Sequence, residues 1–322
     1  MNEHVRSDSQ WSGAPLAFLF PGQGSQEPGM GKALAAAFPA ARRVFEAADA
    51  ALGEPLSQLC FEGPADQLAL TANTQLAILT CSVAVWTVVR EELGLEPAVC
   101  LGHSLGEFSA LVAAGALEFT DAVRLVRLRG RAMQEAVPAG VGAMAAILGA
   151  DPTAVEAWCA EESAGAEIVS PANENGGGQI VIAGHAPAVD RVVARAKDGR
   201  AKAMRLNVSA PFHCALMGPA AERLADALTS VRIGALRVPV IANVDAEPNS
   251  DAAAVRDRLI RQITGRVRWE ASMRTVIRMG ITRGLELGHG RVLGNLIKRI
   301  DKAFAVAAVG SPQDIDVLKV GP

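Results

Sequence analysis

A serine flanked by glycines lies between a short apolar run and an amphipathic segment. Residues 98–101 are apolar, the letters G-H-S-L-G occupy residues 102–106, and apolar residues recur at helical spacing from 107 to 116. A buried strand that turns sharply into a helix needs small residues at the bend. The pattern therefore predicts an α/β fold that presents Ser104 at the end of a strand, beside the free N–H groups of a helix N-terminus.

Other apolar runs extend this α/β pattern on both sides of the serine. We expect strands at residues 16–20, 238–242 and 284–287, and helices at 30–52, 75–89, 122–136 and 216–228. Between them, residues 141–207 show a different order of expected strands and helices. Strands at 143–148, 167–169, 179–183 and 202–208 alternate with helices at 152–160 and 187–197, the β-α-β-β-α-β order of a ferredoxin-like unit.

These patterns predict two domains. The fold class is α/β, with an α/β-hydrolase-like large domain made of residues 16–140 and 208–310 and an inserted ferredoxin-like α+β small domain at 141–207. Residues 1–15 are polar and lack an apolar signal core, so we expect a flexible leader.

Composition excludes several classes of protein. With 31 basic and 34 acidic residues the net charge is −3, which gives no general attraction for nucleic acid. Five cysteines without C-x-x-C spacing predict neither a metal site nor a disulfide framework and fit a reducing cytoplasm. Residues 67–89 are uncharged, but the strongly apolar part, 76–89, is shorter than the ~20 residues of a membrane span. We expect a cytoplasmic protein that does not cross a membrane.

A nucleophilic serine needs a base, and the chain has five histidines. His213 begins a helical run where the chain re-enters the large domain, 109 residues after the serine, whereas the others fall in the leader, in loops or beside Ser104. By elimination His213 is the candidate general base. In α/β-hydrolases the triad follows the chain order serine, acid, histidine. Between Ser104 and His213 no acidic residue stands at an obvious strand end of the large domain. The residues alone leave the third member of a triad open.

Five ordered motifs are more specific than the serine turn. They are F-P-G-Q-G-S-Q at 20–26, G-H-S-L-G-E at 102–107, R-L-R-G at 127–130 with M-Q at 133–134, F-H at 212–213 with L-M at 216–217, and R-Q at 261–262. In this series the chain resembles the malonyl-CoA:acyl carrier protein transacylase family over about residues 17–300.

The resemblance implies a role for each catalytic group. Ser104 attacks the thioester of malonyl-CoA and carries the malonyl group as an ester, and His213 takes its proton and later activates the carrier-protein thiol. The backbone carbonyl of Gln262 orients the histidine in place of a carboxylate. The backbone N–H groups of Gln23 and Leu105 form the oxyanion hole.

The resemblance also implies substrate-binding residues. Arg129 binds the free carboxylate of the malonyl group, which agrees with the fit of a guanidinium fork to a carboxylate. Phe212 and His103, next to the base and the nucleophile, are assigned to the substrate site; a ring at 212 crowds an α-methyl branch and favours malonyl. Basic residues elsewhere on the same helix, at 124, 127 and 131, are expected to form a solvated face.

Malonyl-CoA and acyl carrier protein are the implied partners, without a cofactor, and the expected pathway is fatty-acid biosynthesis. We expect a monomer. The acidic carrier would dock on a local basic patch, either Lys197, Arg200 and Lys202 or Lys298, Arg299 and Lys302. Three alternatives remain open: a stand-alone polyketide acyltransferase, an acyl-thioester hydrolase, and a catalytically silent scaffold.

Overall fold

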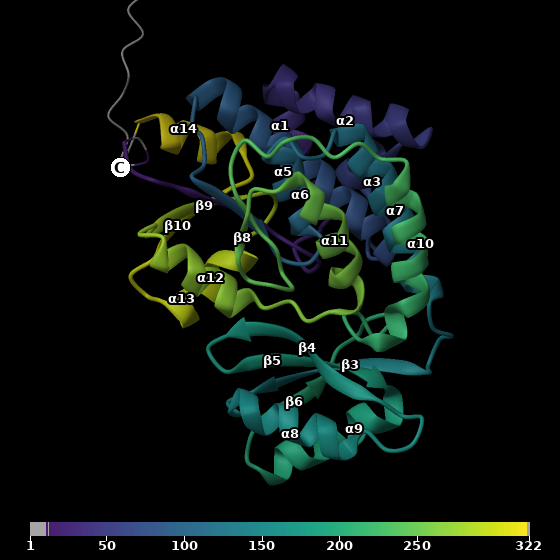
Figure 1. The fold of residues 1–322 in the computed structure, drawn as a ribbon. Helices are drawn as coiled ribbons and strands as arrows, with labels where there is room; N and C mark the ends of the chain where they lie inside the picture. The colour runs from purple at the N-terminus through teal and green to yellow at the C-terminus, as the bar shows by residue number, and fades with distance from the viewer. Residues whose placement is uncertain (1–10, 12, 321–322) are drawn as a thin grey trace, which may run out of the picture.

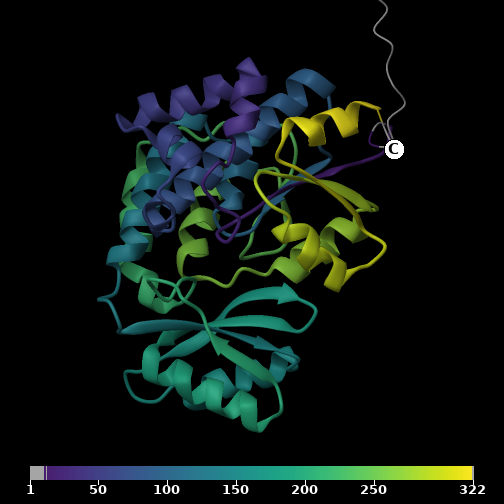
Figure 2. The same ribbon diagram turned by 180° about the vertical axis from the view of Figure 1, so that it is seen from behind.

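The computed structural model describes residue 11 and residues 13–320 and contains two sheets (Figures 1 and 2). The leader expected at residues 1–15 falls mainly on residues 1–10 and 12, which lie outside the described residues. Within that range Trp11 is buried, with 8% of its surface exposed.

The larger sheet has six strands in the order β10-β9-β1-β2-β7-β8, and all neighbours are parallel except β7 and β8. Both central strands are fully buried, as expected for a parallel sheet covered on both faces. The register pairs Phe20 with Gly102, so the segments that follow β1 and β2 leave the sheet side by side. The strands are β1 (Ala17–Phe20), β2 (Val99–Gly102), β7 (Val240–Ile241), β8 (Pro248–Asn249), β9 (Arg283–Leu287) and β10 (Ala305–Val309).

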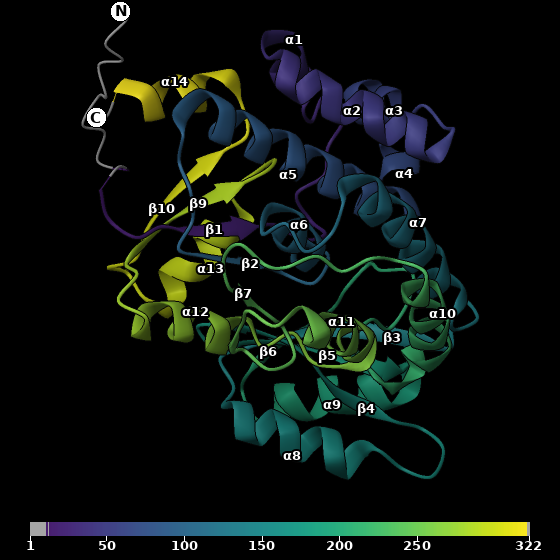
Figure 3. The same ribbon diagram turned by 45° about the horizontal axis from the view of Figure 1, so that its top comes forward.

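Successive side chains of a strand point to opposite faces of this sheet, so the hydrophobic core is divided into two clusters, one on each face. Phe18 and Phe20 pack into a cluster with the long helix α5 (Thr71–Leu93), whereas Leu19 and Leu101 pack against α12 (Trp269–Arg278) and α13 (Val292–Ile300). Figure 3 shows α5 on one side of β1 and β2 and α12 and α13 on the other. The remaining helices of the large part are α1 (Lys32–Ala37), α2 (Pro39–Leu52), α3 (Leu56–Glu62), α4 (Ala65–Leu68), α6 (Gly106–Ala113), α7 (Phe119–Glu135), α10 (Gly218–Thr229), α11 (Val255–Thr264) and α14 (Pro312–Val320).

Helix α5 contains the uncharged stretch of the sequence. By length and composition it is the one helix of the described residues that could cross a membrane, yet 83% of its apolar window is buried inside the protein. It packs between α2 and α7. The interpretation of this segment as a central core helix is confirmed.

The smaller sheet has the antiparallel order β4-β5-β3-β6. Two helices cover one face, while Met144 and Val181 on the other face join the core of the large part (Figure 1). This is the predicted β-α-β-β-α-β unit, and the expected fold class is confirmed; the division at residues 141 and 207 stays a prediction. The elements are β3 (Gly142–Leu148), α8 (Pro152–Glu162), β4 (Val169–Gly176), β5 (Gln179–His185), α9 (Ala186–Asp198) and β6 (Lys202–Arg205).

Some predicted elements were wrong in extent. The single helix expected at 30–52 is two helices, because Phe38 is extended and Pro39 begins α2, a position that suits a residue without an N–H. The strand expected at 167–169 instead runs from Val169 to Gly176 through polar residues and two irregularities in register. Strands β8 and β10 were not predicted; β8 has two residues and β10 is a small-residue run at the sheet edge.

Candidate active site

The turn that holds Ser104 is built around two glycines. Ser104 adopts a left-handed conformation, with φ of 51°, between β2 and α6. A Cβ on Gly102 would lie 2.0 Å from the carbonyl carbon of Gly106, and a Cβ on Gly106 would lie 2.0 Å from the carbonyl oxygen of Phe20. Only glycine fits at both positions, so the sharp strand-to-helix turn depends on them.

Asn243 secures this turn from the loop after β7. Its Oδ1 accepts a hydrogen bond from the Ser104 N–H at 2.7 Å, and its Nδ2 donates to the Gly102 carbonyl at 2.7 Å. The side chain is 1% exposed. Both ends of the turn are therefore tied to one buried amide.

His213 lies against the serine. Its Nε2 is 2.7 Å from Ser104 Oγ, and its Nδ1 is 2.9 Å from the backbone oxygen of Gln262. A carbonyl oxygen can only accept, so Nδ1 carries the hydrogen and Nε2 is left as the acceptor that faces the serine hydroxyl. The structure thus brings together the predicted nucleophile, base and orienting carbonyl, with no carboxylate in the arrangement.

The imidazole of His213 is kept neutral by its surroundings. Burial, and after it the nearby positive charge of Arg129, lower the pKa of His213 to about 3. The side chain is 4% exposed. A neutral imidazole is the form that can accept a proton from the serine.

Arg129 projects from α7 into the same site and is 1% exposed. Its Nη2 donates to Ser104 Oγ at 3.1 Å and to Gln262 Oε1 at 2.9 Å, and its Nη1 donates to Gln75 Oε1 at 2.6 Å. Burial lowers the pKa of Arg129 to about 10, which still leaves it charged at neutral pH. Its Nε has no hydrogen-bond partner. A charged guanidinium thus stands beside the nucleophile.

Two of the other arginines of α7 lie on a solvated face as predicted: Arg124 pairs with Asp121 and Arg131 with Glu54, and both side chains are exposed. For Arg127 the prediction was wrong. Its side chain is 13% exposed, it donates to Asn73 Oδ1 as well as pairing with Glu54, and burial lowers its pKa.

The predicted oxyanion donors lie in the two segments that follow β1 and β2. Gly22 packs so closely that a Cβ there would lie 2.5 Å from the His103 carbonyl oxygen, which places Gln23 beside the turn. Leu105 is the N-cap residue of α6, so its N–H belongs to the donors that have no partner within the helix. Both N–H groups come from backbone at the carboxyl ends of neighbouring strands.

Contacts with other side chains fix the positions of His103 and Phe212. His103 Nε2 lies 2.8 Å from Asn175 Oδ1 on β4, and its ring contacts Trp269 with centroids 5.7 Å apart. Burial lowers the pKa of His103. Phe212 is 6% exposed and belongs to the main core cluster. Their assignment to the substrate site stays a prediction.

Sequence reasoning missed four polar residues at this site. Asn243, Gln75 and Glu107 each contact a catalytic or binding group, and Asn175 reaches His103 from the small sheet. Glu107 is 2% exposed, and burial raises its pKa to about 7. The one available signal was Glu107, an acidic residue in an otherwise apolar helix directly after the serine motif.

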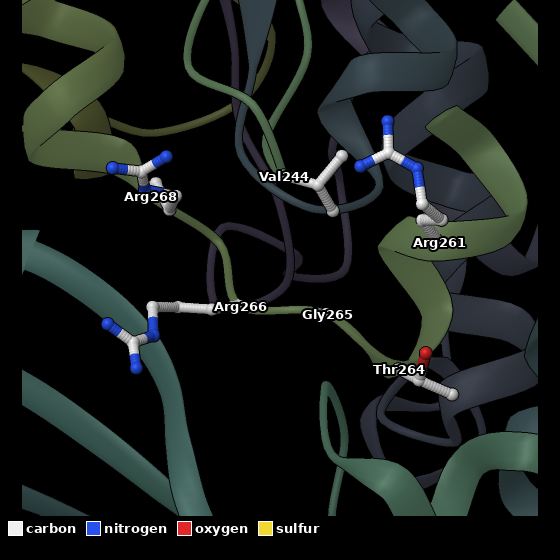
Figure 4. Close-up of a pocket in the computed structure, with 6 residues that line it drawn as sticks. All are labelled: Val244, Arg261, Thr264, Gly265, Arg266 and Arg268. Carbon is white, nitrogen blue, oxygen red and sulfur yellow. The ribbon is translucent and has the colours of Figure 1, made fainter. Parts of the chain in front are cut away.

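A surface pocket of about 440 Å³ is lined by residues next to Asn243 and Gln262 in the chain (Figure 4). Its three guanidinium groups point in different directions and are engaged elsewhere: Arg261 with Asp245 and Asp257, Arg266 with Glu156 and Glu174. The described residues contain no group of three or more His, Cys, Asp or Glu side chains that could hold a metal. The lining residues are Val244, Arg261, Thr264, Gly265, Arg266 and Arg268.

Comparison with known proteins agrees with this geometry. The acyl transferase domain family matches residues 17–307. The malonyl CoA-acyl carrier protein transacylase of Salmonella typhimurium is 49% identical over 298 residues, which cover 92% of this chain and 96% of that protein. The enzyme of the same name from Bacillus subtilis strain 168 is 48% identical over 303 residues, 94% of this chain and 95% of its own.

Solved structures show the same fold. The acyl-carrier-protein S-malonyltransferase from Bartonella henselae superposes with a TM-score of 0.91 at 48% identity, covering 94% of this chain and 98% of that one. A malonyl-transacylase in complex with a type II PKS acyl-carrier protein gives a TM-score of 0.91 at 45% identity, over 95% and 99% of the two chains. With near-half identity along almost its whole length, the chain belongs to the malonyl-CoA:acyl carrier protein transacylase family, as an acyl-carrier-protein S-malonyltransferase.

Proposed function

We propose that the protein transfers a malonyl group from malonyl-CoA to the phosphopantetheine thiol of acyl carrier protein through a malonyl ester on Ser104. One observation carries this proposal: Ser104 Oγ lies 2.7 Å from His213 Nε2 and 3.1 Å from Arg129 Nη2. A nucleophile, its base and a carboxylate-binding cation meet at one oxygen atom.

In the first half-reaction Ser104 Oγ attacks the thioester carbonyl carbon, and its proton passes to His213 Nε2. The C=O electron pair moves to the oxygen, which the N–H groups of Gln23 and Leu105 stabilise. Collapse of this intermediate breaks the C–S bond, and the CoA sulfur leaves with the proton from His213. The Gln262 carbonyl stabilises the transient imidazolium through the Nδ1 hydrogen bond.

The second half-reaction repeats these steps with a new nucleophile. The carrier thiol gives its proton to His213 and attacks the ester carbonyl. The C–O bond to Ser104 then breaks, and Oγ recovers the proton. Because the malonyl group is held as an ester on Ser104 between the two halves, CoA leaves before the carrier thiol reacts, and the kinetics are ping-pong.

Substrate choice depends on Arg129. A malonyl carboxylate pairs with the buried guanidinium, whereas an acetyl group leaves that charge without a partner. Phe212 and His103 complete the pocket around the acyl chain. This requirement for a carboxylate favours malonyl transfer over hydrolysis of neutral acyl thioesters.

The pathway that fits the relatives is fatty-acid biosynthesis, in the cytoplasm, with the enzyme acting as a monomer. The similar malonyl-transacylase solved with a type II PKS acyl-carrier protein supports polyketide synthesis as the second setting. Both settings use the same chemistry and differ only in the carrier that is served.

The carrier docks on Lys298, Arg299 and Lys302 in this proposal. Arg299 donates to Gln179 at 3.0 Å and packs against Gly177, in the turn between β4 and β5. Two residues before Gly177, Asn175 on β4 contacts His103, the neighbour of Ser104. This patch therefore adjoins the strand that contacts the active-site turn. The alternative patch comprises Lys197 near the C-terminus of α9, Arg200 in the following turn and Lys202 at the start of β6.

Intact-protein mass spectrometry tests the proposal. Mixing with malonyl-CoA should add one malonyl group, and holo acyl carrier protein should remove it. A gain that decays as fast without carrier would identify a hydrolase. The Ser104→Ala variant should gain no mass, and a persistent adduct on that variant would refute the nucleophile.

A further inference from the structure

Neutral side chains hold Arg129 in place. Its two terminal nitrogens donate to the amide oxygens of Gln75 and Gln262. Among the described residues no acidic side chain forms an ion pair with it, although twelve other described arginines have such a partner. Neutral amides therefore orient the guanidinium, and Glu107 acts on its charge only from beyond ion-pair distance.

The Gln262 amide can bind Arg129 in only one orientation. Its Nε2 donates to the Ser104 carbonyl at 3.0 Å and to Glu107 Oε2 at 2.8 Å, while its Oε1 faces the arginine. Arginine only donates and the other two partners accept. A flipped amide would set its NH2 against a guanidinium and its oxygen against two acceptors, so all three contacts would become repulsive.

Glu107 accepts the shorter of the two hydrogen bonds that the Gln262 Nε2 donates, 2.8 Å against 3.0 Å to the Ser104 carbonyl. It lies in the first turn of α6, is 2% exposed, and also accepts the backbone N–H of Asn243 at 2.9 Å. In its ionised form the Glu107 carboxylate is a stronger acceptor than the Ser104 carbonyl. The Gln262 amide lies between this carboxylate and Arg129, so Glu107 orients the arginine without pairing with it.

We propose that Glu107 is a positioning residue that sets the preference for dicarboxylic acyl groups, because it turns the Gln262 amide oxygen toward Arg129 and leaves the guanidinium charge for the substrate carboxylate. This inference rests on the proposed function. A direct acidic partner at the same distance would satisfy the charge, and the site would then bind malonyl no better than acetyl.

The test compares Glu107→Ala and Glu107→Gln in single-turnover acylation of Ser104 by malonyl-CoA and by acetyl-CoA. In Glu107→Ala the ratio of the two kcat/KM values should fall roughly tenfold to a hundredfold, as expected when one charge-assisted contact is lost. The fall should appear mainly in KM for malonyl-CoA. Glu107→Gln should lose less, since an amide oxygen can still accept from Gln262 and Asn243.

Glu286 offers a matched control. It is fully buried on β9 and accepts the N–H groups of Leu293 and Gly294, each at 2.8 Å, away from Ser104. Glu286→Gln should lower stability without changing the malonyl-to-acetyl ratio. A wild-type ratio in Glu107→Ala, or an equal fall in Glu286→Gln, would overturn the inference. Wild-type enzyme without any preference for malonyl would instead refute the proposed function.

Discussion

Arg129 Nη2 lies 3.1 Å from Ser104 Oγ, so the proposed carboxylate-binding group touches the proposed nucleophile. A malonyl group has a single methylene between its carboxylate and its thioester carbonyl. In the proposed binding mode, a carboxylate held by Arg129 therefore brings the carbonyl carbon close to Ser104 Oγ and aligns it for attack.

Replacement of Arg129 by alanine should reduce malonyl transfer far more than acetyl transfer. The substrate carboxylate would enter a buried site without a partner, at a cost of about 2–5 kcal/mol in kcat/KM. Arg129→Lys should recover part of this loss, because it restores the charge but not the two-pronged geometry. Unchanged selectivity in acylation assays with the two CoA esters would exclude Arg129 from carboxylate binding.

Removal of the His213 imidazole should change how stability depends on pH. Its pKa is about 3 in the folded protein and near 6.5 when unfolded, so the unfolded chain binds the extra proton as the pH falls below 6.5. Wild-type protein should therefore lose about 2 kcal/mol of stability between pH 7 and pH 5 on account of this group. His213→Gln should lack that component.

Denaturant unfolding of both proteins at several pH values measures this difference. His103, whose pKa is also lowered, is present in both and cancels. Identical pH dependence in the two proteins would mean that His213 titrates normally in the folded state.

Asn243→Ala should slow acylation without unfolding the protein. The variant loses the acceptor for the Ser104 N–H and the donor to Gly102, so the left-handed serine is less firmly placed, and we expect a roughly tenfold lower rate. Asn249→Ala is the control, because that buried amide makes two similar bonds to Asp251 away from the site. Equal rates in the two variants would show that the Asn243 amide does not position Ser104.

Gly106→Ala should destabilise the fold, because its Cβ would lie 2.0 Å from the Phe20 carbonyl oxygen. We expect a loss above about 3 kcal/mol, typical of severe overpacking. Gly218→Ala places a methyl group in open space on α10 and should be neutral or stabilising by up to about 1 kcal/mol. Thermal unfolding of the two variants distinguishes a required close approach from a general effect of losing glycine.

Charge reversal on the docking patch should affect only the second half-reaction. Lys298→Glu with Lys302→Glu should raise KM for acyl carrier protein several-fold, more so at low salt, and leave acylation by malonyl-CoA unchanged. Lys197→Glu with Lys202→Glu on the other patch is the matched control. A larger effect from the control pair would move the docking site to α9.

The sequence predicted those parts of the site that local patterning or a family motif marks. Apolar runs located β1 and β2, and the motifs named Ser104, His213, Gln262 and Arg129, which the fold brings together. The β4 strand was misplaced, since Asn173, Glu174 and Asn175 lack the apolar alternation of a strand and pair through bulges.

The supporting polar residues could not be found in the same way. Gln75 lies near the N-terminus of an apolar helix and Asn243 in a loop, 54 and 139 residues from the groups they contact. Their roles arise only from tertiary packing, because neither spacing nor composition distinguishes a glutamine that meets Arg129 from one that faces solvent. Local sequence patterns and motifs therefore predicted the reacting groups, whereas the residues that orient them became visible only in the folded structure.

Gln262 serves the site twice, through its backbone oxygen to His213 and through its side-chain oxygen to Arg129. With Arg129 as the proposed carboxylate-binding residue, a shift of α11 that admits a different acyl group would also move the acceptor of the base. Engineering toward branched or neutral acyl groups should accordingly leave α11 intact and begin at Phe212, which directly precedes His213 on a different segment and whose apolar ring cannot hydrogen-bond to Gln262 or Arg129.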